Sequence, residues 1–172
     1  MNHCFVPPYL LRQIALSRPE RAAWVEEMLA HDDGVRLQRA ANTAAAAATG
    51  PDWEVYTARN GSGLPGDLVR SPGDPASGDA AVDEAADGVA ASLAMYAEVY
   101  GRDSFDDAGA TVVATVHYQR NYDNAFWNGA QLVFGDGDGE IFDRFTKSVD
   151  VLGHELTPVS YTHLTLPTNR EV

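Results

Sequence analysis

The residues with the clearest chemical potential lie near the end of the chain, in the segment DVLGHELTPVS, Asp150 to Ser160. His154 and Glu155 are adjacent where a helix is expected to begin. An imidazole followed by a carboxylate starts the zinc-binding pattern H-E-x-x-H, whose second histidine lies on the same helical face as the first. Pro158 occupies the position of that second histidine. A single histidine in such a place is also compatible with an ordinary surface or core residue.

The carboxylate of Glu155 has a defined task in a complete site of this kind. On a helix it points about 100° round the axis from His154. From there it can accept a proton from a metal-bound water. A catalytic zinc ion needs three protein ligands and a water, and His154 is the one ligand found at a matching position.

The composition is that of a globular protein with a strongly acidic second part. Of the 172 residues, 45% are hydrophobic and 22% are charged, and no apolar run approaches the roughly 18 residues of a membrane span. The net charge of −13 argues against nucleic acid as a partner, because phosphate contacts need clustered Lys and Arg. Residues 1–50 carry five basic and five acidic groups, so the excess acid lies in residues 51–172. That part is either a solubilising surface or, in places, a calcium-binding one.

The N-terminus, MNHCFVPPYLLRQIA, does not predict a conventional secretory signal peptide, because it lacks a basic start and two prolines interrupt its apolar residues. Cys4 is the only cysteine, which excludes an intramolecular disulfide. Its thiol is either inert or, in a precursor, a thiolate that caps a metal.

Hydrophobic periodicity in the first part of the chain predicts helices. Residues 9–39 are expected to be helical, with Pro19 in the first turn of a second helix that stops near Gly34 and a short third piece after it. The alanine-rich stretch from Asn42 to Trp53 is predicted to be a connector.

The second part alternates strands and helices, which indicates an α+β fold. Two short strands over residues 54–70 should be joined by a turn at Asn60-Gly61. A long, central, largely buried helix should run from Asp79 to Tyr100. A strand over residues 110–119, a strand pair over 124–139 that turns at Asn128-Gly129, and a final helix complete the prediction. The run GDGDGE, 135–140, fails the EF-hand pattern and predicts a turn.

Several spaced motifs in this part resemble the thermolysin family of zinc endopeptidases. They are LPG at 64–66, DPA at 74–76, VHY at 116–118, NAFWNG at 124–129, VFGDGDG at 133–139 and VDVLGHELT at 149–157. Near the start, PPYLL at 7–11 and the short helical region after it resemble the precursors of protealysin-like members, which have a short propeptide.

The resemblance implies three regions. Residues 1–50 would be the propeptide and linker, which act as an intramolecular inhibitor. Residues 51–157 would be the β-rich N-terminal peptidase domain with one long central helix. Residues 158–172 do not match, and the family's helical C-terminal domain, which carries the third zinc ligand, is missing.

The resemblance also implies roles for single residues. His154 would bind zinc, and Glu155 would be the general base for hydrolysis of peptide bonds in peptide or protein substrates. Asp150 would bind calcium, although an aspartate in a first helical turn also suits the helix dipole. An extended substrate would bind to the edge strand at Asn124 and Ala125, with Phe126 in the cleft.

Two outcomes follow for the chain as it stands. Pro158 should end the last helix near Thr157, and the incomplete ligand set predicts a chain without protease activity. The alternative is a non-catalytic module, a pseudo-peptidase that binds peptides or inhibits a related enzyme. Family resemblance favours an extracellular location, while the missing signal peptide leaves a cytoplasmic one open.

Overall fold

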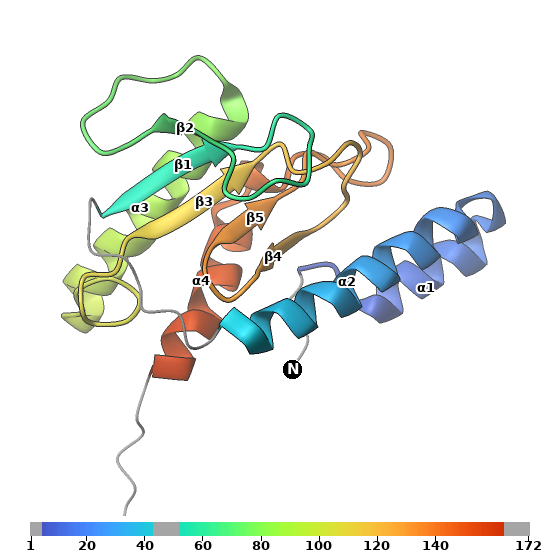
Figure 1. Cartoon of the computed structure of the whole chain (residues 1–172), viewed down its shortest axis with the longest axis horizontal. Helices are drawn as coiled ribbons and strands as arrows, with labels where there is room; N and C mark the ends of the chain where they lie inside the picture. Colours follow the sequence, from blue (N-terminus) through green and yellow to red (C-terminus); the bar gives the residue numbers. More distant parts are fainter. Residues whose placement is uncertain (1–4, 43–51, 164–172) are drawn as a thin grey trace, which may run out of the picture.

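The computed structural model describes residues 5–42 and 52–163 and has the predicted α+β fold (Figure 1). A single five-stranded sheet, in the order β2-β1-β3-β5-β4, lies between helices. The elements are α1 (Pro8–Ser17), the 3-10 helix η1 (Pro19–Arg21), α2 (Ala22–Asn42), β1 (Trp53–Thr57), β2 (Asp67–Arg70), α3 (Ala80–Tyr100), β3 (Val112–Val116), β4 (Ala125–Trp127), β5 (Leu132–Phe134), the 3-10 helix η2 (Phe145–Lys147) and α4 (Val149–His163).

The sheet is mixed, and its interior strands are the most apolar. β3 pairs in parallel with both β1 and β5, and β2 and β4 add to the two edges in the antiparallel direction. Parallel pairing of β1 and β3 requires a long connection, which α3 provides. The predicted strand pair with a turn at Asn128-Gly129 is confirmed as β4 and β5. Its outer member, β4, is the edge along which the N-terminal helices lie.

Helix α3 forms where the sequence predicts it, and its ends are set by two residues. The Asp79 side chain accepts hydrogen bonds from the backbone N–H groups of Ala81 and Val82, and Gly101 ends the helix in the left-handed conformation at φ 62°. The first half of α3 is buried against the sheet, whereas Tyr100 is 62% exposed. The predicted burial therefore holds throughout the first half, while in the second half it is limited to Ser92 and Tyr96.

Helices α3 and α4 pack on the same face of the sheet and touch each other. Their close approach is at Gly88, where an added Cβ would lie 2.9 Å from Leu152 Cδ1. Since α4 also contacts β4 and β5, this packing fixes the start of α4, with His154 and Glu155, beside the edge strand.

Two predicted helix ends are wrong. Helix α2 does not stop near Gly34 but continues to Asn42. A glycine inside a helix costs about 1 kcal/mol, and here Val35 is buried and Arg39 bonds to the sheet, so tertiary contacts outweigh that cost. Helix α4 likewise continues past Thr157 and through Pro158 to His163. Inside a helix a proline removes one backbone hydrogen bond and crowds the preceding turn, at a cost of about 3 kcal/mol, and α4 continues in spite of it.

The turn after β1 lies one residue earlier than predicted. Positive φ angles occur at Arg59 (49°) and Asn60 (61°), and the Gly61 N–H donates to the Ala58 carbonyl. These two angles are those of a type I′ turn. The loop continues to Asp67 before β2 begins, so the two strands are confirmed but the connection is longer than a tight hairpin.

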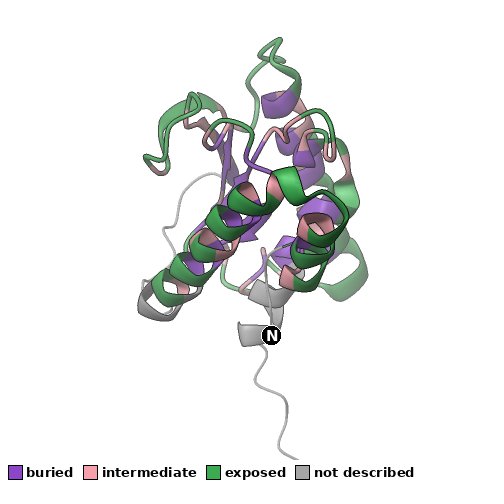
Figure 2. Ribbon diagram, turned by 90° about the vertical axis from the view of Figure 1, so that its right-hand side faces the viewer, coloured by how far each residue is buried: buried purple, intermediate pink, exposed green. Residues whose placement is uncertain are grey.

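The first 38 described residues form a helical hairpin, defined here as residues 5–42, which lies beside β4 (Figure 1). Both helices of the hairpin are largely exposed, with buried residues at intervals along them (Figure 2). The predicted break at Pro19 is confirmed, because this proline starts η1. The alanine-rich connector, residues 43–51, lies outside the described residues, as does Cys4. Among the described helices, none is long and apolar enough to cross a membrane.

His117 joins three segments of the domain. Its Nδ1 lies 2.7 Å from Asp136 Oδ2, in the loop after β5, and its Nε2 lies 2.9 Å from Asp79 Oδ2, at the start of α3. The hydrogen bond to Asp136, supported by Asp79, raises the pKa of His117 to about 9. An imidazolium with both N–H groups on carboxylates therefore holds the end of β3 against α3.

This arrangement predicts a loss of stability at alkaline pH. The pKa of His117 is higher in the folded than in the unfolded chain, so its contribution is complete below about pH 6.5 and is lost as the pH rises through about 9. We expect a loss of about 2 kcal/mol in the free energy of unfolding, after allowance for the partial exposure of the ring. Urea denaturation as a function of pH measures it. A His117→Gln variant with the same pH dependence as the parent would contradict this account.

Candidate functional site

The edge strand β4 and the first turns of α4 meet at the predicted site. All three residues of β4 are buried. The Trp127 N–H donates to Glu155 Oε2 at 3.0 Å, which places the carboxylate of α4 directly on the backbone of the strand. The structure therefore brings together Glu155 and the strand that contains Ala125 and Phe126.

Glu155 is fully buried. Its second oxygen, Oε1, accepts no hydrogen bond from the described residues. Burial raises the pKa of Glu155 to about 8, while Arg39 and the Trp127 N–H act in the opposite direction. A carboxylate that is buried with one oxygen unused is typical of a functional site rather than of a structural core.

His154 lies next to Glu155 but faces outward. Its ring is exposed at the surface of α4 and packs edge-on against the ring of Phe5, with centroids 5.7 Å apart at 87°. Phe5 also packs against Phe145, at 6.0 Å. The helical hairpin thus begins with an aromatic side chain placed on the imidazole that sequence analysis predicts to be a zinc ligand.

The backbone at Phe5 and Val6 adds to the edge of β4. The Phe5 N–H donates to the Ala125 carbonyl at 3.0 Å, and the Val6 N–H donates to Asn124 Oδ1 at 2.8 Å. The Asn124 Nδ2 group returns a bond to the Val6 carbonyl at 3.4 Å. Asn124 is fully buried by these contacts. These bonds use the free edge of β4, the kind of edge to which an extended peptide can add as a further strand.

Phe126 is covered by the same hairpin. Its ring is buried in a cluster with Tyr118, Tyr122 and His31 of α2. His31 Nε2 lies 3.0 Å from the Tyr118 hydroxyl, and burial lowers the pKa of His31. The resemblance places Phe126 in a substrate cleft. In this structure the His31 side chain and helix α2 lie against the Phe126 ring.

Asp150 lies in the exposed first turn of α4. Within residues 5–42 and 52–163, no group of three or more His, Cys, Asp or Glu side chains is arranged to hold a metal ion. The predicted turn at GDGDGE is confirmed: Asp138 Oδ1 accepts bonds from the N–H groups of Glu140 and Ile141. The residues present therefore do not fit a complete zinc or calcium site.

Sequence analysis missed two charged residues of α2 that reach the site. Asp32 Oδ1 lies 3.4 Å from Asn124 Nδ2, and Arg39 Nε donates to the Trp127 carbonyl at 2.8 Å. Asp32 is fully buried. A signal was present: both residues fall on the apolar stripe of the helix at three- and four-residue steps. The members of that stripe are Val25, Met28, Asp32, Val35 and Arg39.

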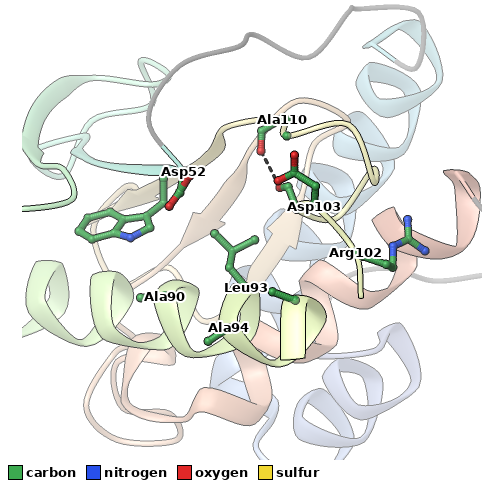
Figure 3. Close-up of a pocket in the computed structure, with 11 residues that line it drawn as sticks. Asp52, Ala90, Leu93, Ala94, Arg102, Asp103 and Ala110 are labelled. Carbon is green, nitrogen blue, oxygen red and sulfur yellow. Dashed lines mark hydrogen bonds between the residues drawn. The ribbon is translucent and has the colours of Figure 1, made fainter. Parts of the chain in front are cut away.

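A surface pocket lies elsewhere, between the start of β1, α3 and the loop over residues 102–110 (Figure 3). Leu93 and the small side chains of Ala90 and Ala94 line it, and the Arg102 side chain points away from it (Figure 3). None of the predicted site residues contributes to this pocket. The candidate site is therefore the covered edge of β4 and not this concavity.

Comparison with known proteins agrees with this geometry. The family described as thermolysin metallopeptidase, catalytic domain, matches residues 28–158. The chain belongs to the thermolysin metallopeptidase family. The matched range contains β4 and the start of α4.

Individual relatives support the same assignment. The chain is 41% identical over 161 residues to protease PrtS of Photorhabdus sp. (strain Az29), an alignment that covers 88% of this chain and 43% of that protein. It is 40% identical over 156 residues to an extracellular metalloprotease of Pectobacterium carotovorum subsp. carotovorum, which covers 88% and 45%. The chain thus spans less than half the length of these thermolysin-family relatives.

A solved structure is similar to both parts of the chain. The precursor of protealysin, a metalloproteinase from Serratia proteamaculans, superposes with a TM-score of 0.73 and 37% sequence identity. The match covers 93% of this chain and 47% of that one. It therefore includes the helical hairpin as well as the sheet, and the resemblance to protealysin-like precursors is confirmed.

Proposed function

We propose that this chain is the precursor form of the N-terminal part of a zinc endopeptidase. The observation that carries the proposal is the occupied edge of β4, where the backbone N–H groups of Phe5 and Val6 are hydrogen-bonded to Ala125 and Asn124, next to His154 and Glu155. A peptide substrate would use the same acceptors, the Ala125 carbonyl and Asn124 Oδ1, and would place its backbone beside the catalytic carboxylate.

In this proposal Glu155 is the general base and His154 is a zinc ligand. Zinc in such sites lowers the pKa of a bound water and polarises the peptide carbonyl. Glu155 contributes a carboxylate held by the Trp127 N–H, so its position relative to the edge strand is fixed before substrate arrives. His154 supplies one of the three protein ligands that a catalytic zinc requires. With Pro158 at the position of the second histidine, the 172-residue chain itself is expected to be inactive.

Residues 1–50 act in this proposal as an inhibitory propeptide. Phe5 and Val6 would fill backbone positions of a substrate, and the Phe5 ring packs edge-on against His154. Helix α2 adds Arg39 on the Trp127 carbonyl and His31 in the aromatic cluster around Phe126. Hydrolysis of peptides would require displacement of the whole helical hairpin, since it supplies all of these contacts.

A chimera tests the catalytic proposal. Residues 1–157 would be joined to the second half of the Photorhabdus relative, with histidine at position 158. We expect the purified chimera to bind zinc and, after removal of the propeptide, to hydrolyse casein. The Glu155→Gln chimera should retain zinc and lose about 10³-fold or more in turnover. Casein hydrolysis by the unaltered 172-residue chain, abolished by a chelator and by Glu155→Gln, would contradict its proposed inactivity.

The alternative function is a non-catalytic module that binds peptides or inhibits a related protease. It is supported by the continuation of α4 as a helix through Pro158, because the fold tolerates the loss of the second histidine. Calorimetric titration of the chain with extended peptides and with a related protease would separate the two proposals. Absence of any binding would exclude the alternative.

Location and calcium binding follow from the family alone. One relative is named an extracellular metalloprotease, and we propose that this protein is also exported. Asp150 is proposed as a calcium ligand that needs partners from outside the described residues.

A further inference from the structure

A cluster of three carboxylates lies next to the edge strand, and it consists of Asp123, Asp138 and Glu140. The helical hairpin places a cation on this carboxylate cluster. Arg21 Nη2 lies 2.9 Å from Asp138 Oδ2 and is hydrogen-bonded to Glu140 Oε2. The Asp138 side chain is 5% exposed, so the guanidinium is bound by a largely buried carboxylate.

Asp123 gives the cluster a buried oxygen that no donor uses. Its side chain is fully buried, and Oδ1 accepts a hydrogen bond from the Asp138 N–H. Oδ2 accepts none from the residues that the structure describes. Burial and the neighbouring Asp138 raise the pKa of Asp123 to about 7, while Arg21 acts in the opposite direction. A buried carboxylate of this kind is stabilised by a cation and is costly without one.

The domain itself holds the cluster in place. Asp138 Oδ1 accepts bonds from the N–H groups of Glu140, Ile141 and Phe142, which leaves Oδ2 for the cation. The Gly137 N–H donates to the Tyr122 carbonyl and ties this loop to the segment that carries Asp123. Asp123 and Asp138 therefore keep their arrangement independently of Arg21, as a preformed site does, and the exposed Glu140 adds to them.

The cluster lies where a bound peptide would continue. The Phe5 N–H contacts Ala125 and the Val6 N–H contacts Asn124, so the chain passes the edge of β4 in the direction of Asp123. In a peptide bound along β4, the residue after the one that contacts Asn124 is the first whose side chain can reach Asp123. In this structure the chain turns into α1 at that point, and Arg21 returns to the cluster from η1.

We propose that the carboxylate cluster is a receptor for the basic side chain of a peptide bound along β4, one or two residues beyond the position at Asn124, and that Arg21 occupies it in the precursor. This deepens the proposed function and rests on it for the peptide. The planar guanidinium suits two carboxylates at once. A metal ion is the less favoured occupant, because the described carboxylates do not form a three-ligand metal site.

Chemical rescue tests the receptor in the whole 172-residue chain. Arg21→Ala removes the cation, and ethylguanidinium is then added while the melting temperature and the amide NMR signals of residues 123 and 138–140 are recorded. We expect ethylguanidinium to stabilise Arg21→Ala and to bind it about tenfold more tightly than it binds Arg21→Ala/Asp123→Asn. The parent chain and the exposed-site control Arg12→Ala should not respond. Arg21→Gln is the second variant if Arg21→Ala does not fold.

Two results would overturn the receptor. One is an equal response to neutral ethylurea, and the other is a larger response to calcium chloride, which would make the cluster a metal site. The peptide is tested separately in the chimera described above: substrates with arginine should be cleaved about tenfold faster than those with citrulline at that position, and Asp123→Asn should remove the difference. An inactive chimera with successful rescue would reject the proposed function and leave the receptor standing, whereas an active chimera without the preference would reject the peptide assignment.

Discussion

Gly135→Ala is expected to abolish the folded state. An added Cβ would lie 1.9 Å from the Tyr122 carbonyl oxygen and 2.8 Å from the Tyr122 ring. The backbone of Gly135 cannot move away easily. Its N–H donates to the Asn124 carbonyl at 3.0 Å, and its carbonyl accepts from the Phe145 N–H at 3.3 Å. Relief of the clash would separate the segments before β4 and after β5. We expect a loss of about 4 kcal/mol or more, which is most of the stability of a domain this size.

Urea denaturation, or the soluble yield where the variant does not fold, measures this effect. Gly34→Ala is the matched control, since nothing lies within 4 Å of its added Cβ and the residue is inside helix α2. That variant should gain about 0.5–1 kcal/mol from helix propensity. A Gly135→Ala chain with a free energy of unfolding within about 1 kcal/mol of the parent would show that the approach to Tyr122 is absent.

Asn124→Ala is expected to release the helical hairpin while the sheet remains folded. The Asn124 side chain accepts from the Val6 and Ala125 N–H groups and donates to the Val6 carbonyl and to Asp32. Its removal leaves several buried polar groups without partners, at about 1–3 kcal/mol for each. The hairpin would lose about 2–4 kcal/mol of docking free energy.

Hydrogen exchange, resolved by segment, separates local release from global unfolding. Amides of α1 and α2 should exchange at least tenfold faster in Asn124→Ala, while those of β3 and β5 keep their protection. Gln13→Ala, which removes an exposed side-chain amide from α1, is the control and should leave both sets unchanged. Equal acceleration in the sheet and the hairpin would show that Asn124 stabilises the domain as a whole.

The parts of the fold that the sequence predicts correctly are those set by local chemistry. Asp79 and Gly101 mark the ends of α3, and the β-branched run over residues 110–119 contains β3. The two wrong helix ends have a different origin. Gly34 taken by itself predicts a helix end, but Val35 is buried in the core and Arg39 is anchored by a hydrogen bond to Trp127, 88 residues away.

The candidate site divides in the same way. The pairing of His154 with Glu155 and the role of β4 as an edge strand were accessible, the first from a motif and the second from family resemblance. The covering of that edge by Phe5, and the burial of Asp32 over Asn124, depend on how the hairpin docks. No periodicity or turn signal in the sequence specifies how the hairpin docks. The one indication is that the charged residues Asp32 and Arg39 lie on the apolar stripe of α2.

The bond between Val6 and Asn124 joins positions 118 residues apart, and this separation sets the order of events during translation. At about 5–20 residues per second, a ribosome needs roughly 6–24 s to add the intervening chain. Throughout that time the two N-terminal helices have no partner strand, and the apolar side chains of Val25, Met28 and Val35 are accessible to chaperones. The helical hairpin is therefore synthesised well before the strand on which it docks, and its bonds to Asn124 can form only after that interval.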